Sequence, residues 1–479
     1  MALLWFPLLI EKTWTSILLL KQSPRELWLI YITKFLSSFS YFSYSLILTL
    51  YLSNEFGFSD EKAGWTYGAY GFMSVLYGMS LGWIVDYLGV RYALLLGAVI
   101  GCLSRLVLAF SSSSHWVVFV LYTFLPFSES LGIPIMTIGI KRYTNSNNRT
   151  IAYSLFYTFM NIAALLSGPI VDLCRTRWSH WTILGHSLDS LQLIILCGSF
   201  STFCIILVVL LGMRNIQFME SGDVCAYPSN TTPLATQLKQ VVHDSSFWRL
   251  ALFMFLLVGV RLVFRHVDAT LPKYMIREFG NDAPFGAFYA INPSLVIILV
   301  PLVGAWSKGV DSFRMILFGS FLSGASVFLL CFGPHYICIA SFLIVLSIGE
   351  AIYSPRVYEY TMQVSGEGRE GLYTSLASIP LFGVVLFAGG MSGYLLQHFC
   401  PIETAQRECN KMWAIIGMFS FSSPLLLFLF RHVIQPFPPT SREVSPRLVS
   451  SHSDDDDDGM EQTITSAWQY PLLSEEDSS

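Results

Sequence analysis

The chain has 479 residues, of which 53% are hydrophobic and only 13% are charged. A soluble globular protein is about a quarter charged, so this composition excludes a soluble protein. The formal net charge is -4, from 28 Lys and Arg against 32 Asp and Glu, and no basic patch with interleaved aromatic residues occurs, which argues against nucleic-acid binding. The nine cysteines form no CxxC pair, so neither a zinc site nor a disulfide framework is indicated.

Long apolar stretches recur along the chain, and a helix needs roughly 20 apolar residues to cross a bilayer core. Twelve are predicted, at 27–52, 63–85, 91–111, 116–140, 150–173, 190–212, 246–271, 283–306, 312–333, 335–362, 371–397 and 411–431. A polar stretch at 213–245 separates the first six from the second six. The pattern predicts an all-α polytopic membrane protein with twelve transmembrane helices in two six-helix bundles, 27–212 and 246–434, joined by a cytosolic linker at 213–245.

The two ends of the chain differ from these bundles. Residues 1–26 predict a cytosolic interfacial segment rather than a signal peptide, because the charges follow the first apolar run and no small-residue cleavage site follows. Residues 435–479 contain the acidic run Asp454–Asp458 and predict a disordered cytosolic tail. Basic residues are modestly enriched in the loops that this topology places inside, so we expect both termini in the cytosol.

The loop after the second span reads Gly82-Trp-Ile-Val-Asp86-Tyr-Leu-Gly89-Val-Arg91. Gly82 permits close helix approach, Asp86 lies at a helix end, and Gly89 supplies a turn before Arg91. An ordinary charged membrane turn would be the simpler interpretation. In spacing and position, however, the segment resembles the loop 2-3 signature of the major facilitator superfamily. The resemblance implies a transporter in which two bundles expose a central polar cavity alternately to each side of the membrane.

Three further segments resemble signatures of the proton-coupled oligopeptide transporter family within that superfamily. They are Ser154-Leu-Phe-Tyr157-Thr-Phe-Met-Asn161 in the fifth span, Tyr289-Ala-Ile-Asn292-Pro293 in the eighth, and Gly349-Glu350-Ala-Ile-Tyr353-Ser354-Pro355 in the tenth. The first span departs from that family, because Lys34, Ser37 and Ser38 stand where its ExxER motif would place Glu, Glu and Arg. The resemblance favours peptide or amino-acid-like substrates, and the departure leaves both proton symport and facilitated diffusion open.

Charged side chains inside the spans are the candidate functional residues, because an ion in mid-membrane costs roughly 2.5 to 3.5 kcal/mol and needs a partner or a wet cavity. By resemblance, spans 1, 4, 7 and 10 line the central cavity. The candidates for substrate binding or coupling on these spans are Lys34, Ser38, Tyr41, Glu129, Arg261, Glu350 and Arg356. Lys34, Ser38 and Tyr41 share one helical face, although Lys34 could instead snorkel to the cytosolic interface.

Glu350 matches the position whose carboxylate, in the resembling family, meets the amino end of a peptide. The alternative is a buried ion pair with Lys34 or an arginine. Arg265 and Asp268 follow Arg261 on one face of span 7, and for these two we expect solvation among the outer headgroups. Prolines within spans are candidate hinges for alternating access, namely Pro126, Pro134, Pro169, Pro293, Pro301, Pro355 and Pro380.

Two signals lie outside the spans. Cys400 and Cys409 bracket the outer loop before the last span, where an oxidising compartment would permit a disulfide. The tail contains Tyr470-Pro-Leu-Leu473, which resembles a Tyr-x-x-Leu sorting signal and raises the prospect of a sorting adaptor as partner. We therefore expect a multi-pass protein of the plasma membrane or of an endosomal or lysosomal membrane.

The sequence as a whole favours transport of a small polar solute, with or without protons. A receptor or accessory membrane protein that keeps the fold without transporting is the alternative, and the missing ExxER motif favours it. We expect no enzymatic activity, metal or cofactor, because no nucleophile with its base, phosphate loop or cluster of metal ligands stands out.

Overall fold

The structure is a computed structural model of the chain. It describes residues 20, 23–80, 82–144, 146–178, 180–183, 186–218, 224–226, 243, 245–307, 310–364, 379–402 and 407–434. Residues 1–19, most of the predicted linker and the predicted tail at 435–479, with Tyr470 and Leu473, lie outside the described residues. So do the side chains of residues 82–87, among them Gly82 and Asp86.

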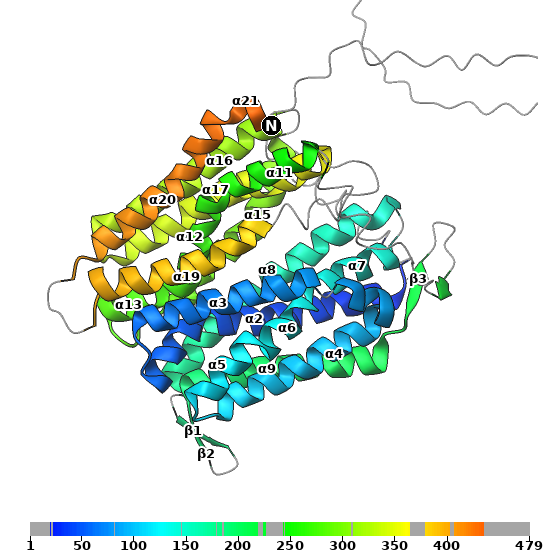
Figure 1. Cartoon of the computed structure of the whole chain (residues 1–479), viewed down its shortest axis with the longest axis horizontal. Helices are drawn as coiled ribbons and strands as arrows, with labels where there is room; N and C mark the ends of the chain where they lie inside the picture. Colours follow the sequence, from blue (N-terminus) through cyan, green and yellow to red (C-terminus); the bar gives the residue numbers. More distant parts are fainter. Residues whose placement is uncertain are drawn as a thin grey trace, which may run out of the picture. The chain divides into compact units, whose positions relative to one another are not determined.

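Helices make up both halves of the described chain (Figure 1). The N-terminal half contains α2 (Arg25–Phe56), α3 (Asp60–Ser80), α4 (Gly82–Phe110), α5 (Ser114–Tyr122), α6 (Phe124–Ser130), α7 (Ile133–Tyr143), α8 (Ser146–Arg177) and α9 (Ser190–Gly212). The C-terminal half contains α11 (Ser245–Leu256), α12 (Val258–Ala269), α13 (Leu271–Phe279), α14 (Phe285–Tyr289), α15 (Ile291–Trp306), α16 (Ser312–Ser326), the 3₁₀ helix η2 (Val327–Phe332), α17 (Tyr336–Val364), α19 (Ile379–Phe399), α20 (Cys409–Leu429) and α21 (Arg431–Ile434).

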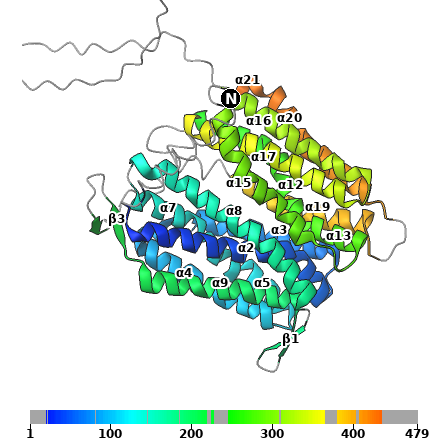
Figure 2. The same ribbon diagram turned by 180° about the vertical axis from the view of Figure 1, so that it is seen from behind.

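Two antiparallel hairpins accompany the helices, and the sequence pattern did not predict them. One pairs β1 (His180–Ile183) with β2 (His186–Asp189) between α8 and α9. The other pairs β3 (Ile216–Phe218) with β4 (Val224–Ala226) at the start of the predicted linker. Both hairpins lie beyond the helix ends (Figure 2).

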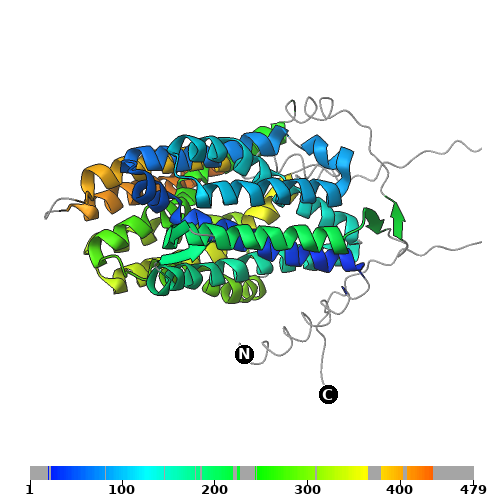
Figure 3. The ribbon, with the colours of Figure 1, turned by 90° about the horizontal axis from the view of Figure 1, so that it is seen from below.

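The long helices run roughly along one common direction, as membrane-spanning helices do (Figure 3). Among the described residues, nine helices are long and apolar enough to cross a bilayer, or ten if the bent pair α11 and α12 is counted as one span. The two other predicted spans, 63–85 and 371–397, overlap α3 and α19, each of 21 residues. At 1.5 Å per residue such a helix is about 31 Å long, close to the thickness of a bilayer core. The predicted all-α polytopic fold is confirmed.

Prolines explain three of the breaks inside the spans. A proline has no N–H to donate to the carbonyl four residues earlier, so the helix is weakest there. Helix α5 ends at Tyr122, four residues before Pro126, and α6 ends at Ser130, four residues before Pro134. Helix α14 likewise ends at Tyr289, four residues before Pro293.

The remaining prolines do not break their helices. Pro169, Pro301 and Pro355 lie inside continuous helices. Pro380 is the second residue of α19. The bend of 46° between α11 and α12 falls at Leu257 and has no proline beside it. Pro126, Pro134 and Pro293 therefore remain the hinge candidates that coincide with a change in the helix.

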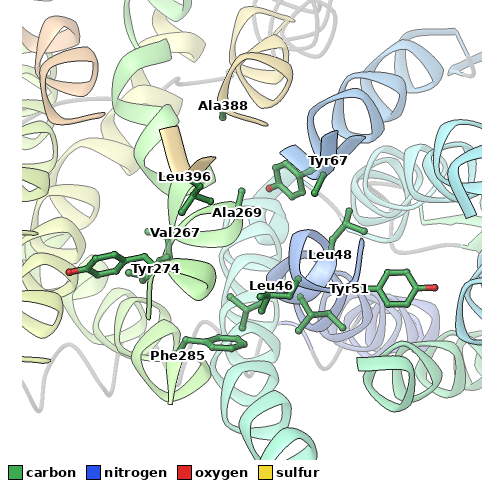
Figure 4. Packing of buried hydrophobic residues seen from close by; sticks show 14 of the residues in the cluster. Leu46, Leu48, Tyr51, Tyr67, Val267, Ala269, Tyr274, Phe285, Ala388 and Leu396 are labelled. Atoms are coloured by element: carbon green, nitrogen blue, oxygen red, sulfur yellow. The ribbon is translucent and has the colours of Figure 1, made fainter. Parts of the chain in front are cut away.

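The two halves share one hydrophobic core where α2 and α3 meet α12, α13 and α19 (Figure 4). Glycines bring the helices close together there. A Cβ on Gly64 would lie 2.3 Å from the carbonyl oxygen of Gly389, and one on Gly168 would lie 2.1 Å from that of Gly286. Larger side chains at these positions would push the halves apart, so glycine is required for the α3–α19 and α8–α14 contacts.

Candidate functional site

The turn at Gly89 and Arg91 is anchored to the end of the sixth span. Gly89 adopts φ +74°, a conformation that favours glycine, and a Cβ there would meet Asn215 Oδ1 at 3.0 Å. Asn215 Oδ1 also accepts a hydrogen bond from the Arg91 N–H at 3.0 Å, and Arg91 Nη2 donates to the Leu210 carbonyl at 2.9 Å. The turn thus ties the start of α4 to the end of α9, within the N-terminal half.

An ion pair is buried in the middle of the N-terminal half. Arg105 Nη2 on α4 lies 2.9 Å from Glu129 Oε1 on α6, and the Arg105 side chain is only 4% exposed. The Tyr70 hydroxyl on α3 donates to the other carboxylate oxygen of Glu129. Glu129 lies on α6, the short helical segment between the two proline breaks of span 4.

A second cluster crosses between the halves. Arg265 Nη1 on α12 donates to the Tyr41 hydroxyl on α2 at 3.1 Å, and it lies 3.6 Å from Asp268 Oδ2. Asp268 is 7% exposed. The prediction of solvation in the outer headgroups is therefore wrong for Asp268, while the Arg265 side chain is 28% exposed and hydrogen-bonded to the other half. The face they share is turned toward the other half, where the Tyr41 hydroxyl accepts a hydrogen bond from the Arg265 guanidinium.

Glu350 lies on α17 in the C-terminal half and is 8% exposed. The Asn292 amide on α15 donates to Glu350 Oε2 at 2.9 Å and to Ser347 Oγ at 3.1 Å. Arg261 on α12 is near enough to interact electrostatically with Glu350, and its guanidinium lies 5.7 Å from the ring centroid of Tyr353. Within the described part of the chain Glu350 forms no ion pair, so the alternative of a Lys34–Glu350 bridge is wrong.

The other predicted site residues are dispersed. Lys34 is buried, with its ammonium 4.6 Å from the centroid of the Phe156 ring, so it does not extend to the cytosolic interface. Ser38 is buried one turn further along α2. Arg356 Nη2 donates to the carbonyl and hydroxyl oxygens of Ser307 at 3.0 and 2.6 Å. The seven candidates therefore occupy several places, and Tyr41 is the one whose hydroxyl contacts the opposite half.

Charged side chains seal the halves together at one end. Asp60, at the start of α3, accepts from Lys273 Nζ at 2.9 Å and from Arg277 Nη2 at 2.6 and 2.7 Å. Lys273 also donates to Ser53 Oγ at 2.6 Å. Both cations come from α13 in the opposite half and are at most 5% exposed. At this end of the helix bundle the two halves are in contact, so the structure is closed there.

A disulfide joins Cys400 to Cys409 at the same end. Arg277 Nη1 donates to the Cys400 carbonyl at 2.5 Å, so the disulfide-bonded loop contacts the same arginine that binds Asp60. Nearby, the Asp172 carboxylate on α8 accepts from the backbone N–H groups of Gly286 and Ala287 at 3.1 and 2.7 Å. We call this region the disulfide end.

The described residues offer one compact group of metal-ligand types, comprising Glu278, Cys400 and Cys409. The two sulfur atoms are bonded to each other, so they are not available as thiolate ligands.

Comparison with known proteins identifies the family. The model of the Major Facilitator Superfamily matches residues 30–390, which is most of the chain. The chain belongs to the Major Facilitator Superfamily. Its two helical halves, and the turn at Gly89 and Arg91 between the second and third spans, agree with this membership.

Relatives of this superfamily member cover parts of its length. It is 29% identical to a dipeptide and tripeptide permease B of Salmonella typhimurium over 167 residues, which is 34% of each chain. It is 23% identical over 368 residues to an uncharacterized MFS-type transporter, C09D4.1, of Caenorhabditis elegans, with 72% of this chain and 59% of the relative covered. The chain thus spans about a third of the length of the permeases it matches.

Solved structures support the fold. A POT family transporter in complex with 5-aminolevulinic acid superposes with a TM-score of 0.69 at 16% identity, covering 86% of this chain and 97% of the other. An auto inhibited POT family peptide transporter gives a TM-score of 0.69 at 14% identity, covering 87% and 99%. This superfamily member is therefore an integral multi-pass membrane protein.

Several contacts of these clusters were not predicted from the sequence. Arg105 and Glu129 are opposite charges in neighbouring spans, and that signal alone could have predicted their pairing. Tyr70 carries no such signal, because tyrosines are frequent in this chain. Lys273 and Arg277 lie in a predicted outer loop and Asp60 lies near the end of another predicted span, and only the packing of the halves brings the three together.

Proposed function

We propose that the chain moves a small polar solute across the membrane by alternating access of its two halves, with peptides or amino-acid-like molecules as the favoured class. The disulfide end is closed here, and transport would require the contacts of Asp60 with Lys273 and Arg277 to open in another part of the cycle. Because opening exchanges buried ion pairs for hydrated ions, the two states can lie within a few kcal/mol of each other.

The observation that carries this proposal is the state of Glu350. Its carboxylate is buried, held by the neutral Asn292 amide, and without an ion pair among the described residues. A buried carboxylate is costly unless a cation compensates it. A substrate ammonium group would supply that cation, as the resemblance to peptide transporters implies, and the similarity to the Salmonella permease supports the same substrate class.

The remaining candidates have supporting roles in this proposal. Arg261, and with it Arg356 and Lys34, places positive charge in the membrane-embedded part, which suits the carboxylate end of a zwitterionic solute. Ser38 and Tyr41 lie on the same helix as Lys34, and Tyr41 links that helix to Arg265. Glu129 and Glu350 are the two carboxylates through which protons could be coupled, since Lys34, Ser37 and Ser38 replace the first-span acidic motif.

The location in the cell is also part of the proposal. The disulfide supports an oxidising environment at its end of the protein, and hence cytosolic termini with residues 213–245 as a cytosolic linker. We propose the plasma membrane or an endosomal or lysosomal membrane, with Tyr470 and Leu473 as a contact for a sorting adaptor.

Uptake of radiolabelled dialanine by the full-length protein in proteoliposomes tests the proposal. Uptake that follows an imposed pH gradient supports proton symport, and uptake that is indifferent to the gradient supports facilitated diffusion. The replacement of the ExxER motif favours one other function, a non-transporting receptor. Absence of flux for dialanine and for a broad panel of peptides and amino acids would support that receptor and contradict transport.

A further inference from the structure

A polar cavity lies inside the N-terminal half, away from the boundary between the halves. It has about 40 Å³ of room for water centres. Its polar lining comes from α2, α4, α6 and α9, namely Thr33, Ser37, Ser40, Arg105, Ser128, Glu129 and Thr202. Since one water centre needs roughly 10 to 15 Å³, the cavity has space for about three water molecules.

The cavity walls contain polar atoms that water would satisfy. Thr33 Oγ1 and Arg105 Nε are buried and have no hydrogen-bond partner among the described residues. A buried polar atom left unpaired is unfavourable, so hydration of these two atoms is favourable. They lie at different depths, because Thr33 is near the start of α2 while Arg105 is near the end of α4.

The residues that line the cavity lie between the Arg105–Glu129 pair and the end opposite the disulfide. Leu94, which also lines it, precedes Arg105 by 11 positions on α4. At 1.5 Å per residue their backbone positions are about 16 Å apart along the helix, and the Arg105 guanidinium reaches back toward Leu94 and donates to the Gly101 carbonyl. Ser53, by contrast, lies beyond Ser40 on α2 and contacts Lys273 at the disulfide end. The cavity is thus lined by one half alone, on the side of the Arg105–Glu129 pair that faces away from the disulfide end.

We propose that Glu129 is the proton-binding site of this transporter, and that water inside the N-terminal half, rather than the passage between the halves, delivers the proton. A hydrated proton in the cavity transfers to a Glu129 carboxylate oxygen, which leaves water and a neutral carboxylic acid. The Arg105–Glu129 pair then changes from net zero to a charge of +1.

The groups around Glu129 determine how the positive charge left by its protonation affects the protein. Arg105 from α4 and Tyr70 from α3 contact the Glu129 carboxylate, and Tyr44 and Tyr41 from α2 are the other titratable groups near it. The lining residues of α9 and α7, Thr202, Ile205 and Met136, carry no titratable group. Arg105 is therefore the only permanent charge against Glu129 among the described residues, and protonation leaves it without its ion-pair partner.

Two contacts connect this change to the other half. Tyr70 belongs to α3, which packs on α19 through Gly64 and Gly68. Tyr41, which lies near Glu129, accepts a hydrogen bond from Arg265 Nη1 of the other half at 3.1 Å. Protonation of Glu129 weakens its interaction with Tyr70 and removes the negative charge near Tyr41, so both of these contacts respond. In this scheme the proton and the solute occupy different sites, with the solute at Glu350.

Proton binding at Glu129 serves transport only if the proposed transport function holds, so the inference rests on that function. The binding itself can be tested without any substrate. Infrared difference spectra of the full-length protein in lipid nanodiscs, recorded between neutral and acidic pH, report carboxylic acid groups by their C=O stretch. We expect a band that appears on acidification, is lost in Glu129→Gln and is retained in Glu350→Gln. If Glu129→Gln does not fold, Glu129→Asp should shift the band. A band that is unaffected by both Glu129 variants, or lost equally in Glu350→Gln, would overturn the assignment.

The route is tested by filling the cavity. Ala98 lines it, and Ala98→Leu should lower the rate of the same band after a pH jump at least tenfold, without changing its final amplitude. Leu106→Phe is the matched control, because Leu106 lines a separate apolar pocket next to α4. An unchanged rate in Ala98→Leu would contradict delivery through this cavity.

The two proposals fail separately. If the band behaves as expected but no solute moves in proteoliposomes, the inference stands and the transport function falls. If a pH gradient drives dialanine uptake but the band ignores Glu129, transport stands and this inference falls.

Discussion

Glu129 and Glu350 are both largely buried carboxylates in the middle of a span, one in each half, yet their surroundings are opposite. Glu129 has an arginine at 2.9 Å and a tyrosine hydroxyl in the same half. Glu350 has a neutral amide at 2.9 Å and an arginine that acts only at longer range. The first carboxylate is compensated by the protein itself, and the second is not.

This difference separates a carboxylate that the protein itself pairs with a cation from one that is available to an external cation. An internally compensated carboxylate contributes to the stability of its half, because removing its partner leaves a buried charge. An uncompensated carboxylate contributes little to stability and is available to an external cation. The two clusters should therefore respond in opposite ways to substitution, in folding on one side and in substrate binding on the other.

The largest effect is expected for Arg105→Gln. The substitution leaves the Glu129 carboxylate buried and unpaired, which costs about 3 to 5 kcal/mol. Denaturant titration of the purified protein in detergent, followed by tryptophan fluorescence, measures the free energy of unfolding. Adding Glu129→Gln to Arg105→Gln should recover most of the loss, since it removes the orphaned charge. A loss below about 1 kcal/mol, or no recovery in the double variant, would show that the pair does not stabilise the half.

Glu350→Gln should have the reverse profile. Its unfolding free energy should stay within about 1 kcal/mol of wild type, because no ion pair is broken and Gln can still accept from Asn292. Dialanine uptake should fall by about 100-fold or more, corresponding to the loss of a charge-paired contact worth roughly 3 kcal/mol. Glu350→Asp is the matched control and should retain part of the activity. Wild-type uptake with an intact response to the pH gradient would remove Glu350 from the mechanism.

Asn292→Ala should have a smaller effect of the same kind. Asn292 orients the Glu350 carboxylate through one hydrogen bond, and a hydrogen bond to a charged group is worth about 1.5 to 3 kcal/mol. We expect the KM for dialanine to rise about tenfold, with a smaller change in the maximal rate. Asn292→Asp provides a sharper test, because a second carboxylate beside Glu350 should abolish uptake at neutral pH and restore part of it at acidic pH.

The sequence predicted the helices well because their signals are local. Apolar length located the spans, and the prolines at 126, 134 and 293 account for three breaks by the loss of one hydrogen bond each. The bend at Leu257 could not be predicted in this way. There, Gly259 packs against α20 and the Val260 N–H donates to Ser423 Oγ at 3.1 Å, a contact that depends on a helix more than 150 residues away.

The candidate site was only partly predictable for the same reason. That Lys34, Glu129, Arg261 and Glu350 are embedded follows from their positions in apolar stretches. Their partners do not follow, because pairing depends on how the helices rotate toward one another. Lys34 packs on Phe156 rather than on an acid, and Arg265 and Asp268 face the other half although they lie near a span end.

The smallest expected effect concerns Asp60, a third carboxylate that extends the comparison because its ion pairs cross between the halves. Asp60→Asn weakens the contacts of Lys273 and Arg277 but leaves the Asp172 contacts and the glycine packing in place. The cost should therefore appear in the balance between closed and open states, at about 1 kcal/mol or a fivefold change in population, and not in unfolding. Glu61→Gln is the matched control, since the Glu61 side chain forms no ion pair among the described residues.

A spin-label pair across the disulfide end, at Glu55 and Gln397, can measure this shift by electron–electron distance spectroscopy. Asp60→Asn should increase the long-distance population about fivefold over both wild type and Glu61→Gln. If the distribution stays the same while unfolding becomes easier by several kcal/mol, Asp60 acts on the free energy of unfolding, as expected for the Arg105–Glu129 pair. Its bridges would then hold the fold together instead of holding one end closed, and opening would have to occur elsewhere.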